Sequence, residues 1–596
     1  MLRSLRTGVF FALIAVTALS PLGMVWADQS APAPEAIIAQ DGGEPVTSYF
    51  TSTTNVSTLD PARGEDSLSI NWIENLFLGL TNNNPLNNFE IQPELATSWT
   101  TEDGQRWVFN IRTDVPWVRY DPATGESEIL GNVTATDIEW SIKRACDPRL
   151  GSRYSSIIAG VIAGCDIINR SDSDSLTDED IFGDTVQVSA PDEATLIIDL
   201  QYPAPFFFSM TSIWTIRPVH RPTVEEFGDN WTDPGIIVTN GPYMVEELTP
   251  DVRRVAVRNP HIPQDIIGPG NIDRIEINNV RDGNTTFSLF LNDQVDIAGI
   301  PAAELESVRT DPVLSQQIVP SFNSSVSYIA FDHARPPFDD VHLRRAFNAV
   351  IDRETYIQQI ALGQGEPMLH FTPPGMFGAP PSLNDPGIGF NPEYAREQLA
   401  LSGYPNCEGL PPISVATGSG GGDTFQFLQS SVAEHLGCPE DLFTIEELEF
   451  SVLLEITAFD QPVQNRPHMW SLAWGPDYPD ANNWVGDVIS CFKDNNFLRP
   501  CSEVDDLIEA AARETDPTRR TELYFEVEAR LFGRQVDSGV TVDGETPFIP
   551  LALSSAFSLI KPWYDGPFET DGLIGGAHWD WRTVDQEAQQ AARDGN

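Results

Sequence analysis

The chain has 596 residues, of which 41% are hydrophobic, and its 87 acidic and 35 basic side chains give a formal net charge of −52. Nucleic acids and anionic membranes bind basic surfaces, so this charge excludes both as partners. A chain of this length exceeds what one hydrophobic core organises, and it predicts two or three lobes.

The amino-terminal residues have the order of a secretory signal peptide. Arg3 and Arg6 precede an apolar run from Val9 to Leu19, and Val25–Ala27 form a cleavage signal. The run is too short to span a membrane, which needs about 20 residues, and no later segment is long and apolar enough. We expect residues 1–27 to be a signal peptide, residues 28–44 to be a flexible lead-in, and the mature chain to be periplasmic or secreted without membrane insertion.

Periodic patterns predict individual elements in chain order. Residues 107–111 alternate between large apolar and smaller or polar side chains, as in a strand with one buried face. Thr134 and Asp137 are spaced as a capping box at the start of a helix. Asp340 precedes a helical stripe of buried positions, and Asn391 with Pro392 begins a further helix that Gly403 closes. The stripe consists of Leu343, Ala346, Phe347, Val350 and Ile351.

The six cysteines favour disulfides in an exported chain. They fall into local pairs, which are Cys146 with Cys165, Cys407 with Cys438, and Cys491 with Cys501. Other connectivities are open, and local pairing is the simplest because short loops close most easily. No zinc spacing accompanies the cysteines and the eight histidines are scattered, so no metal or cofactor is expected.

A series of short motifs runs along nearly the whole chain. The motifs are Leu59-Asp60-Pro61, Pro93–Trp99, Val133–Arg144, Asn240-Gly241-Pro242-Tyr243, Asn259-Pro260, Val295-Asp296-Ile297, Pro336–Asp340, Asn391-Pro392-Glu393, Gly403-Tyr404-Pro405, Asp477-Tyr478-Pro479-Asp480 and Pro547–Leu551. Through these motifs and their order, the chain resembles the family 5 solute-binding proteins of ABC importers. This group contains the periplasmic oligopeptide-binding and dipeptide-binding proteins.

The resemblance implies a bilobed α/β fold of the large three-subdomain periplasmic-binding-protein type, with a ligand cleft between the lobes. The predicted parts are lobe I at 45–80, 215–298 and 546–596, an inserted subdomain at 81–214, and lobe II at 299–545. The chain departs from the family after Trp117, where a longer acidic loop replaces a short turn. It also has Asp332 where the family commonly has Asn, so no ligand contact is carried over to that position.

The segment Trp470–Trp484 concentrates aromatic and acidic side chains and is the predicted recognition loop. In peptide-binding relatives the residue that matches Asp477 pairs with the α-amino group of the ligand, and flanking main-chain groups pair with the peptide backbone, which gives affinity without side-chain selectivity. The flanking candidates are Ala473, Trp474, Gly475 and Tyr478. Asp477 could instead cap a turn, and Trp474 could fill the core.

Two further segments are candidate ligand contacts by the same resemblance. Tyr49, Phe50 and Thr51 match the first strand, which contributes backbone hydrogen bonds in relatives, although the two aromatic residues also suit a core. Asn240 and Gly241 lie where the chain returns to lobe I, and Gly241 permits a close backbone approach.

No motif indicates catalysis. The run Gly418–Gly422 lacks the Lys-Ser/Thr ending of a phosphate loop, no GxSxG or HExxH occurs, and His468 is a lone histidine beside the recognition loop. We therefore expect a monomeric carrier, not an enzyme, that delivers peptides to the permease subunits of an ABC importer. The alternatives are a non-peptide ligand (an oligosaccharide, an opine-like conjugate or a metal chelate), a secreted enzyme, and a sensory or chaperone-like binding module.

Overall fold

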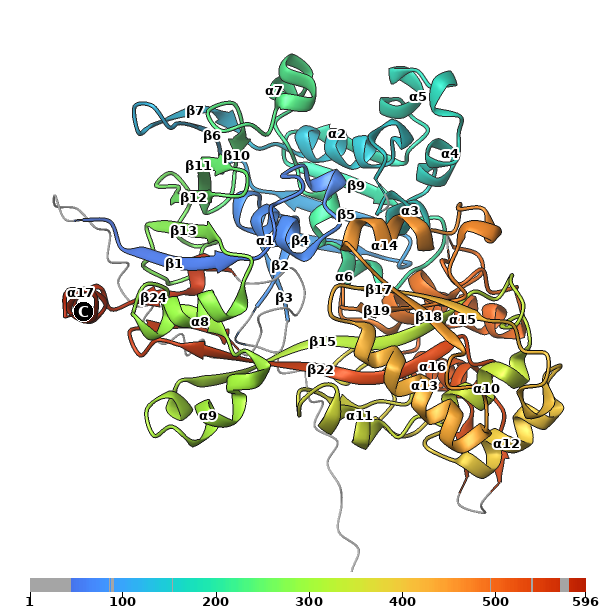
Figure 1. Cartoon of the computed structure of the whole chain (residues 1–596). Coiled ribbons are helices and arrows are strands. Elements are labelled where there is room, and N and C mark those ends of the chain that lie inside the picture. The colour runs from blue at the N-terminus through green and yellow to red at the C-terminus, as the bar shows by residue number, and fades with distance from the viewer. Residues whose placement is uncertain are drawn as a thin grey trace, which may run out of the picture. The chain divides into compact units, whose positions relative to one another are not determined.

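Two long antiparallel strands, β15 (Ile318–Phe331) and β22 (Phe548–Ile560), run side by side through the largest sheet (Figure 1). The computed structural model describes residues 44–84, 86, 90–152, 154–493, 495–536, 540–568 and 578–595, all of which belong to one compact unit of the chain. The predicted signal peptide and the lead-in up to residue 43 lie outside the described residues.

The largest sheet has seven strands in the order β14-β22-β15-β19-β17-β18, with β16 paired to β22. The pairs that include β15 or β22 are antiparallel, whereas β17 is parallel to both of its neighbours. Besides β15 and β22, the strands of this sheet are β14 (Ile297–Gly299), β16 (Glu366–Pro367), β17 (Ile413–Gly418), β18 (Phe443–Leu448) and β19 (Met469–Trp474).

Both faces of this sheet are buried. Successive residues of β15 enter different cores: Tyr328 and Ala330 belong to one apolar cluster, and Ile329 and Phe331 belong to another. Helices α10 (Val341–Ala349), α12 (Pro392–Leu401) and α13 (Gly422–Leu436) contribute to the cluster of Ile329. Helices α15 (Glu503–Arg513) and α16 (Pro517–Phe532) contribute to the cluster of Tyr328. A sheet that is covered by helices on both faces is the arrangement expected of an α/β fold.

The remaining strands form smaller sheets. They are β1 (Thr47–Ser52), β13 (Arg274–Asn279), β12 (Arg253–Arg258) and β11 (Tyr243–Thr249) in one sheet; β4 (Ala96–Thr101), β5 (Arg106–Ile111), β9 (Thr195–Asp199) and β8 (Val188–Asp192) in a second; β10 (Val238–Thr239), β6 (Pro116–Asp121) and β7 (Glu126–Asn132) in a third; and the pairs β2 (Thr81–Asn83) with β3 (Ile91–Pro93), β20 (Arg534–Gln535) with β21 (Thr541–Val542), and β23 (Tyr564–Asp565) with β24 (Thr583–Val584).

The α-helices vary in length, and most of the longer ones follow β15 in the chain. They are α1 (Ser67–Leu76), α2 (Ala135–Ala145), α3 (Ser155–Ala159), α4 (Cys165–Asn169), α5 (Asp178–Phe182), α6 (Phe207–Met210), α7 (Arg221–Phe227), α8 (Gly283–Leu291), α9 (Leu305–Thr310), α10 (Val341–Ala349), α11 (Arg353–Gln359), α12 (Pro392–Leu401), α13 (Gly422–Leu436), α14 (Phe450–Thr457), α15 (Glu503–Arg513), α16 (Pro517–Phe532) and α17 (Gln586–Asp594).

The local predictions agree closely with these elements. β5 buries Trp107, Phe109 and Ile111 on one face, and Thr134 forms a capping box with Asp137 at the start of α2. The stripe that follows Asp340 is fully buried, although α10 ends at Ala349 and its last two positions lie just beyond the helix. α12 ends at Leu401 with Ser402 as its C-cap, so Gly403 directly follows the end of the helix, as predicted.

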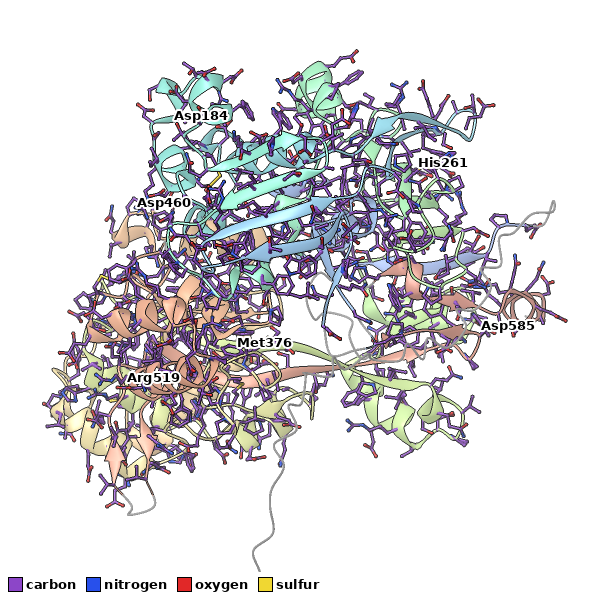
Figure 2. All side chains as sticks on the ribbon, turned by 180° about the vertical axis from the view of Figure 1, so that it is seen from behind. Asp184, His261, Met376, Asp460, Arg519 and Asp585 are labelled. Atoms are coloured by element: carbon purple, nitrogen blue, oxygen red, sulfur yellow. A yellow bond between two sulfur atoms is a disulfide. The ribbon has the colours of Figure 1, made fainter. Side chains whose placement is uncertain are left out.

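Disulfides join the three predicted local pairs, which are Cys146 with Cys165, Cys407 with Cys438 and Cys491 with Cys501. The acidic segment after Trp117 forms the hairpin of β6 and β7, which the ion pair of Arg119 with Glu128 spans. Other acidic residues, such as Asp184, Asp460 and Asp585, are exposed at the surface (Figure 2).

Several acidic residues of the family-like motifs hold the fold together. Asp60 forms a bidentate ion pair with Arg144, at 2.9 and 2.6 Å, so two motifs far apart in sequence meet in the interior. Asp332 forms a 2.8 Å ion pair with Arg466, and both side chains have no exposed area. The predicted lobe boundaries stay predictions, and β15 and β22 are paired over most of their length.

Candidate functional site

The predicted recognition loop consists of three structural parts. Its first residues, Trp470–Trp474, belong to β19, an interior strand of the large sheet. Residues 475–481 connect β19 to a π-helix, η10 (Asn482–Ile489). Trp470 and Trp484 have no exposed area and pack in the core, so these two aromatic residues are structural. Helices of the π type are rare and are frequently found at functional sites.

Asp477 is the central polar residue of the connecting segment, and it is only 5% exposed. One carboxylate oxygen accepts a hydrogen bond from the Tyr154 hydroxyl at 3.2 Å, and the other accepts one from Asn483 Nδ2 at 2.8 Å. The Asp477 backbone N–H donates to Asn483 Oδ1 at 2.9 Å. The carboxylate thus has two neutral donors and forms no ion pair with a basic side chain among the described residues.

The pKa of Asp477 is raised from 3.8 to about 7, chiefly by burial and also by the charge of the nearby Asp487, while the hydrogen bonds from Asn483 and Tyr154 lower it. Asp487 lies on η10, and burial also raises its pKa. Its carboxylate accepts a hydrogen bond from the Tyr478 hydroxyl at 2.5 Å and lies 3.8 Å from Lys493 Nζ. Two buried carboxylates next to each other form an environment that favours a bound cation.

Tyr154 was not predicted from the sequence. It precedes the short helix α3 in the predicted inserted subdomain and packs edge-on against Trp214, with ring centroids 4.8 Å apart. Burial first, and then the charge of Asp477, raise the pKa of Tyr154 well above 10.0, so its hydroxyl remains a donor. No motif surrounds this tyrosine, and only the folded chain reveals its contact with Asp477.

Other residues of the same motif join the recognition segment to the rest of the chain. Tyr478 is fully buried and stacks on Phe206, with ring centroids 6.0 Å apart. Asp480 forms a bidentate ion pair with Arg520, at 2.8 and 2.7 Å. Asp480 therefore has its own buried cation, in contrast to Asp477.

The remaining flanking candidates lie at the end of β19. Ala473 and Gly475 are exposed, and the half-buried Trp474 donates its indole N–H to Asn483 Oδ1 at 3.3 Å. A Cβ atom at Gly475 would have open space around it. These residues are the accessible part of the segment beside Asp477, and their contact with a ligand stays a prediction.

The first-strand candidates lie elsewhere in the fold, on the edge strand β1. Tyr49 has both main-chain groups bonded to Asp296, and the Arg593 guanidinium lies 3.7 Å from its ring centroid. Phe50 packs edge-on against Tyr564, and the Thr51 hydroxyl lies 3.1 Å from that of Thr286. Tyr49 and Phe50 therefore have packing partners, and the contact of the three residues with a ligand stays a prediction.

Asn240 and Gly241 have packing contacts in the interior. Asn240 Oδ1 accepts the N–H of Leu78 at 3.0 Å, and a Cβ atom on Gly241 would lie 2.5 Å from the Leu76 carbonyl carbon. The close backbone approach that Gly241 permits is thus an approach to α1. Tyr154 and Phe206 of the predicted inserted subdomain contact the recognition segment.

Two other candidate features have structural explanations. The N–H groups of Gly420 and Gly422 both donate to the Glu447 carboxylate, at 2.9 and 3.1 Å, so an acidic side chain occupies the position that a phosphate would need. His468 Nδ1 accepts the N–H of Ser414 at 2.9 Å, and burial lowers the pKa of His468 to about 4. Within the described ranges, no group of three His, Cys, Asp or Glu side chains is arranged to hold a metal ion.

Residues 90–496 match the bacterial extracellular solute-binding proteins, family 5 (middle region). This match covers more than half of the chain, and the protein belongs to this family. The family and the mixed α/β fold predicted from the motifs are therefore confirmed.

Curated relatives cover most of the chain at low identity. The periplasmic oligopeptide-binding protein OppA of Salmonella typhimurium is 26% identical over 595 residues, with 96% of each chain covered. The probable deoxycholate-binding periplasmic protein YgiS of Escherichia coli is 24% identical over 530 residues, covering 87% of this chain and 90% of YgiS.

Solved structures share the fold. The murein tripeptide binding protein MppA of Escherichia coli superposes with a TM-score of 0.74 at 22% identity, covering 91% of this chain and 99% of MppA. Haemophilus influenzae OppA in complex with RPPGFSPFR has a TM-score of 0.72 at 18% identity, covering 91% of this chain and 99% of OppA. Among the helices that the structure describes, none has the length and apolar character that crossing a membrane requires.

Proposed function

We propose that this protein is an extracytoplasmic carrier that captures short peptides and delivers them to the permease subunits of an ABC importer. Its family consists of extracellular solute-binding proteins, and the relatives named above include peptide-binding proteins. The chain acts by binding and not by catalysis, and residues 1–27 direct its export. It works as a monomer that holds its ligand between two lobes.

The observation that carries this proposal is the burial and the hydrogen bonding of the Asp477 carboxylate. Among the described residues, no basic side chain pairs with this buried carboxylate, which has two neutral hydrogen-bond donors and a second acid nearby. Every peptide with a free amino terminus supplies a cation that can pair with the carboxylate. The same group occurs whatever the side chains of the peptide are, so this anchor gives affinity without sequence selectivity.

A second candidate function keeps the carrier role and changes the ligand. YgiS is named as a probable deoxycholate-binding protein, and a further relative, heme-binding protein A of Haemophilus influenzae, is 23% identical over 503 residues. Members of this sequence group thus include proteins named for non-peptide ligands. An oligosaccharide, an opine-like conjugate or a metal chelate is the corresponding alternative here.

Two measurements test the proposal. Mass spectrometry of the protein purified without refolding identifies any retained ligand, and a mixture of short peptides is the expected result. Titration calorimetry then compares peptides that have a free amino terminus with the same peptides after acetylation. We expect acetylation of the peptide, or Asp477→Ala in the protein, to cost about 2–5 kcal/mol of binding free energy. Equal affinity for free and acetylated peptides would refute the anchor, and a single retained non-peptide compound would favour the alternative.

A further inference from the structure

A cavity of about 260 Å³ is lined in part by Asn482 and Gly486 of η10 and by Ser490, the residue that follows it. One wall comes from residues 156–170 with Gln201 and Tyr202, and the other comes from η10, the loop after it and α15. Its volume is close to the lower end of small-molecule sites, which begin at about 300 Å³. A single acidic group with a few carbon atoms fits this volume, and a whole peptide does not.

The lining of this cavity is basic in a strongly acidic protein. Arg170, Lys493 and Arg513 line it together with the two acids Asp166 and Glu509. In the whole sequence acidic residues outnumber basic residues by 87 to 35, so an excess of basic over acidic side chains at one cavity runs against the composition.

Two of these three basic side chains have an acidic partner at long distance, and the third has no acidic partner among the described residues. Glu509 lies 3.6 Å from Arg513, and Lys493 lies 3.8 Å from Asp487, which are both long ion pairs. Arg170 is exposed and forms no ion pair within the described part of the chain. The Arg513 guanidinium lies 4.7 Å from the Tyr202 ring centroid, which holds it across the two walls.

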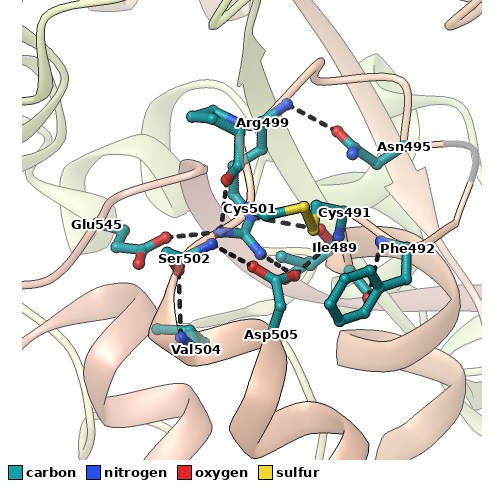
Figure 3. Close-up of a disulfide and its surroundings, with 12 residues drawn as sticks. Ile489, Cys491, Phe492, Asn495, Arg499, Cys501, Ser502, Val504, Asp505 and Glu545 are labelled. Atoms are coloured by element: carbon teal, nitrogen blue, oxygen red, sulfur yellow. Dashed lines mark hydrogen bonds and ion pairs between the residues drawn. A yellow bond between two sulfur atoms is a disulfide. The ribbon is translucent and has the colours of Figure 1, made fainter.

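The loop that carries Lys493 is held in place. The disulfide of Cys491 with Cys501 closes this loop, and Asp505 accepts the N–H of Cys491 at 2.8 Å (Figure 3). Arg499 inside the loop forms ion pairs with Asp505 and with Glu545, the latter at 2.9 Å. Lys493 is therefore presented from a covalently closed and internally bonded segment, as expected of a preformed site.

A continuous set of contacts joins the cavity to the predicted anchor. Asn483 donates from the same Nδ2 to Asp477 at 2.8 Å and to Asp487 at 3.4 Å, and Asp487 faces Lys493. An acidic group in the cavity and an ammonium group at Asp477 would therefore be linked through Asn483 and Asp487. The charges at the two places are complementary to the two ends of a zwitterionic or acidic ligand.

We propose that this cavity binds a carboxylate group, with Arg170 and Arg513 as its main partners and Lys493 as a third cation. Guanidinium groups recognise carboxylates through paired, charge-assisted hydrogen bonds. The carboxylate comes either from an acidic residue of the captured peptide, in which case the inference rests on the proposed function, or from a free organic acid.

The experiment compares tripeptides that carry Glu at each position in turn with the matching Gln tripeptides, and it adds free succinate as a separate probe. Titration calorimetry is performed on the full chain and on the double variant Arg170→Gln/Arg513→Gln. Arg519→Gln is the matched control, because Arg519 is exposed on α16 and is not part of the cavity lining (Figure 2). Thermal unfolding confirms that both variants fold.

If the peptide supplies the carboxylate, Glu at one position improves affinity about tenfold over Gln, and the double variant abolishes this difference while the control retains it. If a free acid is the ligand, succinate binds protein that is already saturated with a neutral peptide, and the double variant loses this binding. Absence of both effects in protein that binds neutral peptides overturns the inference and leaves the proposed function intact. Failure of neutral peptides to bind refutes the proposed function. The succinate titration then tests by itself whether the cavity binds a carboxylate.

Discussion

The Tyr154 hydroxyl donates a hydrogen bond to the Asp477 carboxylate at 3.2 Å, although 323 positions separate the two residues in the chain. The donor belongs to the predicted inserted subdomain and the acceptor to the predicted second lobe. This bond joins the two parts at the residue that we expect to bind the ligand, so ligand binding and the association of these parts are coupled through Asp477.

Tyr154→Phe should weaken peptide binding, because it removes one of the two neutral donors of the Asp477 carboxylate. A hydrogen bond to a charged group contributes about 1.5–3 kcal/mol, and this value is the upper limit of the loss of binding free energy expected in calorimetry near pH 8. Tyr394→Phe is a matched control, since it removes a Tyr–Asp hydrogen bond, to Asp543, far from the recognition segment in sequence. A similar loss of affinity in both variants would contradict the specific role of Tyr154.

Peptide affinity should depend on pH in a defined way. The pKa of Asp477 is raised to about 7, so the carboxyl group is protonated and neutral below that pH and cannot attract an ammonium group. Affinity should therefore fall as the pH decreases below about 7, and binding near neutral pH should release protons. At the alkaline end affinity should fall again above about pH 8, where the α-amino group of the peptide loses its charge.

Calorimetry between about pH 5.5 and 9 in buffers of different ionisation enthalpy measures both the affinity and the protons released. Asp477→Asn should remove the dependence below pH 7 and leave the alkaline decrease in place. An unchanged acid dependence in Asp477→Asn would assign the titration to another group.

The free energy of unfolding should be greatest at about pH 5.5, where the opposing effects of buried acids and buried histidines balance. Burial raises the pKa of Glu74 to about 7 and that of Glu94 to about 8, from 4.5 for both. Between pH 4.5 and these raised pKa values, the folded state therefore binds more protons than the unfolded state. The free energy of unfolding consequently decreases as the pH rises from about 5 to 8. Burial lowers the pKa values of His468 and His578 from 6.5 to about 4, so stability also decreases as the pH falls from 6.5 toward 4.

Urea unfolding at a series of pH values measures this profile, and the alkaline decrease should be on the order of 3 kcal/mol. Glu94→Gln should flatten the alkaline side, because it removes the group with the larger upward shift. A stability that increases steadily from pH 6 to 9 would be incompatible with these buried acids.

Replacing both cysteines of the last disulfide, as Cys491→Ser/Cys501→Ser, should lower the free energy of unfolding by about 2–3 kcal/mol. The two residues are 10 positions apart, and a closed loop of this length reduces the entropy of the unfolded chain by roughly that amount. Chemical denaturation measures the change, with Cys407→Ser/Cys438→Ser as a comparison in which a loop of 31 positions predicts a somewhat larger loss. A smaller loss for the longer loop would contradict the entropic explanation.

Local signals predicted local structure well. The alternation in β5, the capping box of α2 and the cysteine spacing each depend on residues close together in the chain, so the sequence carries the full signal. The motif made Asp477 a candidate for the ligand anchor, and this role stays a prediction. Its hydrogen-bond partner Tyr154 could not be predicted, because Tyr154 lies in a segment without any motif. Trp470 and Trp484 resembled binding residues in sequence, yet the sheet and η10 place both in the core.

The most distant contacts in the fold connect the first strand with the last helix. Gln589 on α17 donates to the Thr47 carbonyl of β1 across 542 positions, and also to Asp296, which accepts the N–H of Tyr49. During synthesis, β1 is made long before α17, so the hydrogen bonds from Gln589 can form only after the last residues have been added. A product that ends a few residues early would therefore lack the hydrogen bonds that α17 gives to β1. Proteases should cleave such a product near β1 as well as near its shortened carboxyl-terminal end.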